Sequence, residues 1–317
     1  MLSRRHLRIK ALQSLYAFMQ SHNDRLDYGE KELLRSLDKL YEIYIYQLSL
    51  LVEITDYAKK RIEENSRKFY PTKEDLNPNT RFVDNRFINM LSDNRSYNAY
   101  IEKYKISWAD EEEMIRKLFI KIRDSKFYKD YMDDPDSSFE KDKDFIIKIV
   151  KKVISESDSL HFYYEERNIY WADDFYTANY LVIKTIKGFQ ERQDELTPLP
   201  TLFKNDSDED KEFVVNLFRK VILRSDEYFE MIEGKVKNWE SDRLAVMDIL
   251  LLKMALAELL EFPSIPVKVT LNEYIELSKM FSTPKSKVFI NGILDKMISD
   301  LKRKNEIKKT GRGLLEN

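Results

Sequence analysis

Apolar residues recur every three to four positions through most of the chain, which is the spacing of one face of an α-helix. The first such segment begins after Ser3, a residue type that caps helices, and runs to about His22. Further helices are predicted over residues 29–68, 109–127, 143–157, 160–192, 210–237, 241–262, 271–281 and 287–303. No stretch sustains the strict alternation of a β-strand, so the pattern predicts an all-α fold.

Two stretches interrupt this helical pattern. Residues 71–100 are polar, rich in asparagine and contain Pro78, which predicts a loop or mobile connection. Residues 197–210, TPLPTLFKNDSDED, combine prolines with acids, and we expect a domain boundary there. A chain of 317 residues is long enough for about two domains.

The chain also carries an internal repeat at an offset of 68 positions. Nine residues from Phe145 to Asp174 are identical to those 68 positions further on, and Trp171 falls on Trp239. Two amphipathic helices can agree by chance at their aliphatic positions. A register without gaps that also carries a tryptophan favours a partial duplication.

The composition excludes several classes of protein. Lys+Arg 54 and Asp+Glu 56 give a net charge of -2, which excludes a uniformly basic nucleic-acid coat. The absence of cysteine excludes a disulfide framework, a thiolate zinc site and a cysteine nucleophile. No window approaches 18 uninterrupted apolar residues, and the basic start lacks a cleavage site, so we expect a cytoplasmic protein without a membrane span.

Two local basic spots stand out against this balanced charge. Arg4, Arg5 and Arg8 all precede the first acid, and guanidinium groups suit phosphates and base edges. An ordinary basic terminus has the same composition, so these arginines alone leave both interpretations open. Lys285 and Lys287 form the second spot, in a predicted turn.

The segment around this turn, residues 266–296, holds the densest signals. Thr270 and Glu273 have the spacing of a capping box, which predicts a helix start. Gly292 inside the last helix costs about 1 kcal/mol relative to alanine, which suggests close helix packing. Phe289 could stack on an unpaired base or pack in the core.

Two segments resemble the NusB family of bacterial transcription antitermination factors: RRHLRIKALQSLYAF at 4–18 and DRLAVMDILLLKMALAELLEFPSIPVKVTLNEYIELSKMFSTPKSKVFINGILDK at 242–296. The resemblance implies a cytoplasmic, all-helical protein with no enzymatic activity, cofactor or metal. It also implies three partners, which are boxA-type single-stranded RNA in ribosomal RNA leaders, the small-subunit ribosomal protein NusE and the transcription elongation complex.

The resemblance also implies site residues. Its RNA-binding positions fall on Arg4, Arg5, Arg8, Tyr16, Lys285, Lys287 and Phe289. Its partner-facing acidic position falls on Asp248. These assignments predict that two distant basic segments fold together into one RNA-binding surface.

Family members are about half as long as this chain, which implies a large helical insertion. The predicted parts are an N-terminal helix at 1–28 that packs with a NusB-like domain at 206–304, a helical insertion domain at 29–200, and a flexible basic tail at 305–317. The function of the insertion is not inherited from the family.

Two enzyme classes are disfavoured. NusB-like domains also occur fused to RNA cytosine methyltransferases, but those enzymes need a cysteine nucleophile and a glycine-rich cofactor loop, which this chain lacks. A metal-dependent nuclease needs acids from separate elements, whereas the acids at 110–113 spread round one helix. The remaining alternative is a protein-interaction scaffold without RNA binding.

Overall fold

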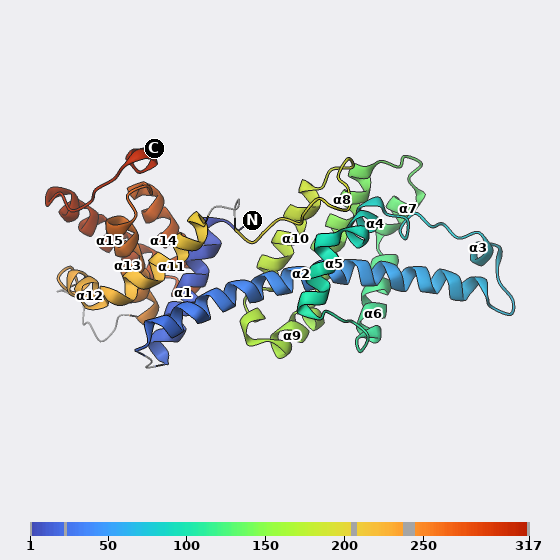
Figure 1. Cartoon of the computed structure of the whole chain (residues 1–317), viewed down its shortest axis with the longest axis horizontal. Coiled ribbons are helices and arrows are strands. Elements are labelled where there is room, and N and C mark those ends of the chain that lie inside the picture. The colour runs from blue at the N-terminus through green and yellow to red at the C-terminus, as the bar shows by residue number, and fades with distance from the viewer. Residues whose placement is uncertain (1, 22–23, 204–207, 237–244, 316–317) are drawn as a thin grey trace. The chain divides into compact units, whose positions relative to one another are not determined.

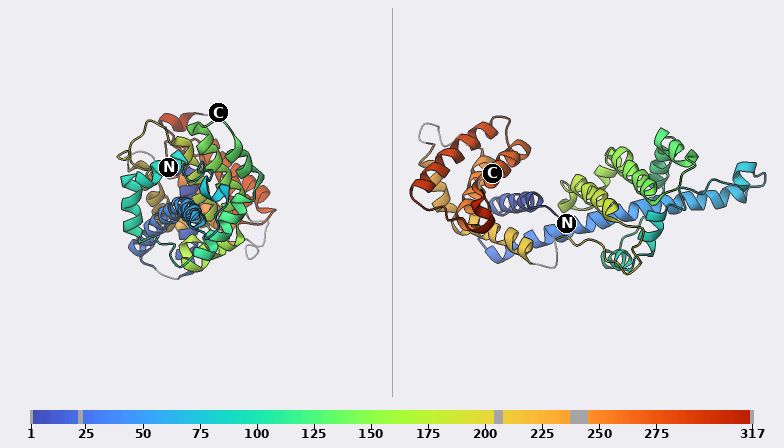
Figure 2. Two further views of the ribbon diagram at one scale, coloured as in Figure 1. Left: turned by 90° about the vertical axis from the view of Figure 1, so that its right-hand side faces the viewer. Right: turned by 90° about the horizontal axis from the view of Figure 1, so that it is seen from above.

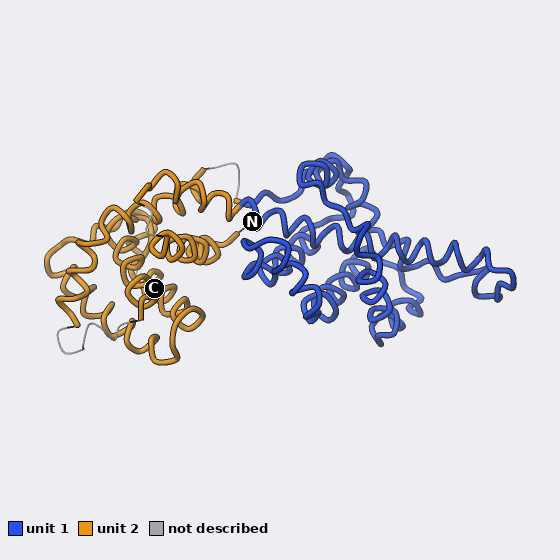
Figure 3. The backbone as a smooth tube through the Cα atoms, turned by 90° about the horizontal axis from the view of Figure 1, so that it is seen from below, with its two compact units in different colours: residues 1, 38–202 blue, residues 2–37, 203–317 orange. Residues whose placement is uncertain are grey.

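The structure is a computed structural model that describes residues 2–21, 24–203, 208–236 and 245–315 (Figures 1 and 2). Every regular element within these ranges is helical, which confirms the predicted all-α fold. The chain divides into two compact units, one of residues 38–202 and one of residues 2–37 with 203–317 (Figure 3). Helix α2 (Leu26–Ser66) contributes residues to both units.

The unit that contains both basic spots is built round one central helix. Its other elements are α1 (Arg4–Gln20), α11 (Glu209–Leu223), α12 (Ser225–Glu233), α14 (Val267–Phe281), α15 (Ser286–Arg303) and a short 3-10 turn, η4 (Gly311–Leu314). Helix α13 (Val246–Glu261) packs against α1, α11, α12, α14 and α15. Eleven of its sixteen residues are buried, as expected for a helix that is apolar on nearly all sides.

The first helix begins as its sequence predicts. Ser3 Oγ accepts a hydrogen bond from the backbone amide of His6, and the Ser3 amide donates in return to His6 Nδ1. The helical spacing of its apolar residues predicts a buried stripe of Leu7, Ala11, Leu15, Phe18 and Met19. Leu7, Ala11 and Leu15 are fully buried and Phe18 and Met19 are half-buried, so α1 docks in the core of this unit by this face.

Two expectations about the C-terminal helices are wrong. Helix α14 begins at Val267, so Thr270 lies inside it, where its hydroxyl donates to Glu258 at 2.8 Å instead of capping. At Gly292, an added Cβ would meet no described atom within 4 Å. This face of α15 is exposed, so the glycine does not mark close packing.

The other unit surrounds the middle of α2, where every residue from 40 to 51 is buried. Its remaining helices are α3 (Lys73–Leu76), α4 (Arg86–Asp93), α5 (Arg95–Tyr104), α6 (Glu112–Arg123), α7 (Lys126–Asp133), α8 (Phe139–Ile149), the π-helical η1 (Val150–Ile154), α9 (Asp158–Arg167), the 3-10 turn η2 (Ile169–Trp171) and α10 (Phe175–Gly188). Aromatic residues fill its core, and Tyr46 of α2 makes edge contacts with Trp108 and Trp171. The aromatics of this region therefore serve mainly as core.

The predicted loop at 71–100 is wrong, because α3 and α4 lie within it and α5 begins in it. Asn85 Oδ1 accepts from the amide of Ile88, and Asn94 Oδ1 accepts from the amide of Tyr97. Asparagine is common in loops, but it is also among the best helix caps. Phe87 between the two caps is fully buried and anchors α4 in the core.

The two copies of the repeat are both helical. Within the described residues, the first spans α8, η1, α9 and η2, and the second spans α11 and α12. Phe145 and its counterpart Phe213 are both buried, whereas Trp239 lies outside the described residues. The duplication and the origin of 29–200 as an insertion stay predictions.

Candidate nucleic-acid interface

A buried ion pair connects the first helix to the central one. Arg8 Nε and Nη2 donate to the two carboxylate oxygens of Glu258, both at 2.8 Å. Arg8 is only 3 % exposed and Glu258 is 0 % exposed. Burial alone would lower the pKa of Arg8, but the charge and hydrogen bonds of Glu258 outweigh it and raise that pKa, so the guanidinium stays cationic.

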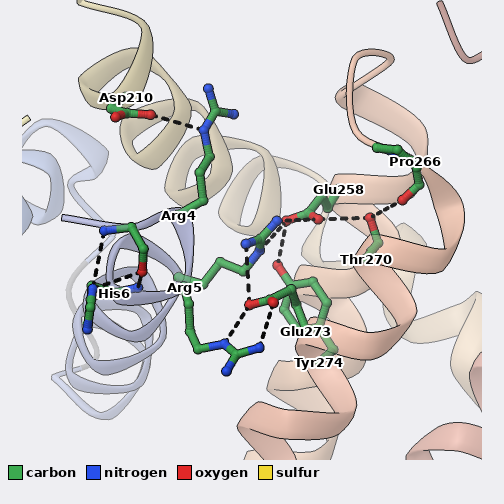
Figure 4. A network of polar contacts seen from close by, with 11 residues as sticks. Arg4, Arg5, His6, Asp210, Glu258, Pro266, Thr270, Glu273 and Tyr274 are labelled. Carbon is green, nitrogen blue, oxygen red and sulfur yellow. Dashed lines mark hydrogen bonds and ion pairs between the residues drawn. The ribbon is translucent and has the colours of Figure 1, made fainter. Parts of the chain in front are cut away.

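Helix α14 adds two more donors to the same carboxylate. The Thr270 hydroxyl donates to Glu258 Oε1 at 2.8 Å, and the Tyr274 hydroxyl donates to Oε2 at 3.3 Å (Figure 4). Burial first, and then the charge of Glu258, raise the pKa of Tyr274 well above its ordinary value. We call Arg8, Glu258, Thr270 and Tyr274 the Glu258 network, and it ties α1, α13 and α14 together.

Arg5 lies at the edge of this network and is exposed. Its Nε and Nη2 donate to the two oxygens of Glu273 at 2.9 and 2.7 Å, and these hydrogen bonds raise the pKa of Arg5 (Figure 4). Its Nη1 has no hydrogen-bond partner among the described residues. Arg5 can therefore keep its ion pair with Glu273 and still donate a hydrogen bond to a further acceptor.

Arg4 is also paired, but on the other side of α1. It donates to Asp210 at 3.0 Å and to Glu209 at 2.6 Å, both in the first turn of α11. Its guanidinium carbon lies 4.5 Å from the centroid of the Phe213 ring. Acids thus compensate the N-terminal arginines, so this end of α1 is less positive than its sequence suggests.

Tyr16 lies about two turns along α1 from Arg8. Its side chain is 40 % exposed. An aromatic ring of this kind can stack on an unpaired base.

The second basic spot lies at the start of α15, with Lys285 in the turn before the helix and Lys287 in its first turn. Asp248, in the first turn of α13, is 6 % exposed and accepts hydrogen bonds from Ser282 Oγ at 2.5 Å and Ser286 Oγ at 2.8 Å. The acid therefore holds both sides of the turn. Lys285 and Lys287 are exposed there and have no ion-pair partner in the described parts of the chain.

Phe289 follows on the next turn of α15 and is half-buried. Part of its ring therefore packs in the unit and part faces solvent. Both uses foreseen for this residue, core packing and base stacking, remain open to it.

The two basic groups belong to one unit but lie at opposite ends of the α13 and α14 pair. Glu258 of α13 contacts Thr270 of α14, and Asp248 contacts Ser282, so the helices run antiparallel. Ten residues of α13 separate Asp248 from Glu258, which is about 15 Å of helix. The formation of one RNA-binding surface from both spots stays a prediction.

Sequence reasoning found the cations but missed most of their partners. Glu209 and Asp210 read as ordinary first-turn acids of a helix, and nothing local indicates that they face Arg4. No local signal in the sequence identifies Arg8, Thr270 and Tyr274 as the partners of Glu258.

These features define an all-helical protein within the described residues. No group of three or more histidine or acidic residues in the described ranges could hold a metal ion. None of the helices described is long and apolar enough to cross a membrane.

Comparison with known proteins identifies the family. A model described as the NusB family matches residues 180–299. The chain is 39% identical over 138 residues to the transcription antitermination protein NusB of Salinibacter ruber, covering 42% of this chain and 86% of that protein. It is 39% identical over 106 residues to that of Chloroherpeton thalassium, covering 33% and 50%. No solved structure gives a significant match.

The chain belongs to the NusB family. This is a family of transcription antitermination factors and not of enzymes, which confirms both the predicted family and the prediction of a non-enzymatic protein.

Proposed function

We propose that the protein acts in transcription antitermination by binding boxA-type single-stranded RNA of ribosomal RNA leaders together with the ribosomal protein NusE. The observation that carries the proposal is membership of the NusB family. The exposed and unpaired Lys285 and Lys287 support it, because they lie where the family resemblance expects RNA contacts. The protein would act in the cytoplasm, within the transcription elongation complex.

Each site residue takes a role that follows from its exposure. Lys285, Lys287 and Arg5 contact phosphates, because their donors face solvent. Arg4 contributes a phosphate contact through Nη1, which donates to neither Glu209 nor Asp210. The strand spans the length of the α13 and α14 pair, because the basic spots lie at its two ends.

The other predicted residues act through packing or stacking. Tyr16 and the exposed part of Phe289 stack on unpaired bases. Arg8, bound inside the Glu258 network, positions the first turn of α1 for RNA. Asp248 supports the partner-binding surface indirectly, because it holds the turn between α14 and α15 in place.

Such a site binds RNA weakly on its own. Roughly three to five phosphate contacts give a salt slope of about -0.7 per contact on a single strand. Part of the N-terminal charge is already neutralised by Glu209, Asp210 and Glu273. Binding should therefore be strengthened by the protein partner.

Titration of a labelled boxA-like RNA, with and without NusE, tests the proposal. We expect Lys285→Ala with Lys287→Ala to weaken RNA binding about tenfold and to flatten the salt slope by about 1.4, because two phosphate contacts are lost. The control is Lys129→Ala with Lys148→Ala, which removes two exposed lysines from the other unit.

Two outcomes would contradict the proposal. The first is equal binding of boxA-like and scrambled RNA at the same salt concentration. The second is capture of NusE with no RNA bound at all, which would instead support a protein-interaction scaffold without RNA binding.

A further inference from the structure

The segment after α15 is strongly basic. Lys304, Lys308, Lys309 and Arg312 lie within nine residues, and Glu306 is the one acid among them. Lys308 and Arg312 are exposed, and neither side chain has a hydrogen-bond or ion-pair partner within the described ranges. These two cations are available to an anionic ligand.

This segment is seated on the end of the central helix. Lys309 Nζ donates to the backbone carbonyl of Phe262 at 2.9 Å and to that of Glu258 at 3.4 Å. The Thr310 amide donates to the carbonyl of Pro263 at 3.0 Å. Both carbonyls lie at the C-terminal end of α13, where the partial negative charge of the helix attracts the Lys309 ammonium and offsets part of the cost of burying it.

Gly313 makes the contact close. It is buried, and an added Cβ would lie 1.9 Å from the carbonyl oxygen of Pro263. No side chain fits at this distance without moving the segment. The segment is thus held by side-chain, backbone and steric contacts.

The docking point places the segment at the arginine end of α13. The backbone carbonyl of Glu258 accepts from Lys309, and the carboxylate of the same residue accepts from Arg8. Arg4 and Arg5 are each paired with acids at this end, whereas Lys308 and Arg312 are not. The uncompensated positive charge here therefore includes the C-terminal segment.

We propose that residues 304–315, docked on the end of α13, are a third RNA-binding segment in which Lys308 and Arg312 neutralise phosphates of the bound single strand. The inference rests on the proposed RNA-binding function and assigns it a contact surface beyond α1 and the turn before α15. It explains how a site whose N-terminal arginines are paired with acids can still attract a polyanion.

Two variants of the 317-residue chain separate the charge of the segment from its docking. Lys308→Ala with Arg312→Ala removes two cations and leaves Lys309 and Gly313 in place. Gly313→Ala keeps every charge but cannot keep the contact with Pro263. Lys129→Ala with Lys148→Ala is again the charge-matched control from the other unit.

Fluorescence anisotropy with boxA-like RNA at several salt concentrations gives affinity and salt slope together. We expect the double variant to lose about 1.4 of the slope and to bind about tenfold more weakly, because two phosphate contacts disappear. Gly313→Ala should bind severalfold more weakly with unchanged net charge. Circular dichroism confirms that each variant is folded.

The outcomes distinguish this inference from the function on which it rests. If the unmodified protein binds no RNA, the proposed function fails and this inference fails with it. If the unmodified protein binds RNA, and Lys308→Ala with Arg312→Ala leaves affinity and slope unchanged, the inference alone is overturned. An equal loss in the control pair, or full affinity in Gly313→Ala, also overturns it.

Discussion

Arg8 and Glu258 form an ion pair that solvent scarcely reaches, so removal of one member leaves a buried charge without its counter-ion. We expect Arg8→Ala to lower the free energy of unfolding by about 3–5 kcal/mol, the usual result of breaking such a pair. Urea denaturation measures the effect. Arg8→Met combined with Glu258→Leu should recover much of the loss, because both charges are removed together.

Arg5→Ala is the matched comparison, since its pair with Glu273 is exposed. Exposed pairs contribute about 0–1 kcal/mol, so this variant should fold normally. Loss of RNA binding in Arg5→Ala would therefore report on the interface and not on stability. For the buried pair, the contradicting result is a decrease of less than 1 kcal/mol in the free energy of unfolding of Arg8→Ala, which would show that this pair is not needed for folding.

Lys309 gives the protein a predicted pH dependence. Burial, opposed by the charge of Glu258, lowers the pKa of Lys309 to about 8 from 10.5. Between these values the unfolded chain holds a proton that the folded chain has released, so the stability contributed by this group rises with pH.

Lys309→Met provides the reference for this effect. The unfolding free energy of the unmodified protein minus that of Lys309→Met should increase between about pH 7.5 and about pH 9.5. Urea titrations at the two pH values give the difference. A constant difference would mean that the amine remains in water and that the segment is not seated on α13.

At the scale of elements, two helical glycines should respond to alanine in opposite directions. Gly292 on α15 has free space round its missing side chain, so Gly292→Ala should stabilise the protein by about 1 kcal/mol. At Gly29 on α2, a Cβ would lie 2.7 Å from the rings of both Phe18 and Phe218, so Gly29→Ala should destabilise it. Thermal unfolding of both variants checks the prediction, and a shift of the same sign in both would contradict it.

Helical periodicity located most elements, but helix boundaries depend on side-chain roles that spacing does not show. The segment predicted as one helix at 160–192 is divided at Asn168, whose side chain caps η2. The predicted helix at 210–237 ends and restarts at Arg224. Asn85 and Asn94, read as loop residues, begin helices because their side chains accept from free amides.

Thr270 shows the same limit at the site. Its spacing to Glu273 fits a cap, yet its hydroxyl serves a carboxylate twelve residues earlier in the chain. Only the packing of α13 against α14 reveals that choice. Local patterns predict which residues can donate and accept, and tertiary contacts decide with which partner they do so.

At the scale of the molecule, a net charge of -2 conceals how the charges are arranged. The arginines at 4, 5 and 8 are each compensated by an acid from another helix, whereas the lysines at 285 and 287 are not. The sequence identified both groups as basic but could not rank them, because the compensating acids lie more than two hundred positions away. Uncompensated charge, and not the number of arginines, indicates where a polyanion binds.

One carboxylate, that of Glu258, joins the start of the chain to two later helices, while the carbonyl of the same residue receives the C-terminal segment. A substitution at Glu258 alone would therefore disturb all of these contacts together. Across related sequences, replacement of Glu258 by a neutral residue should occur only together with replacement of Arg8.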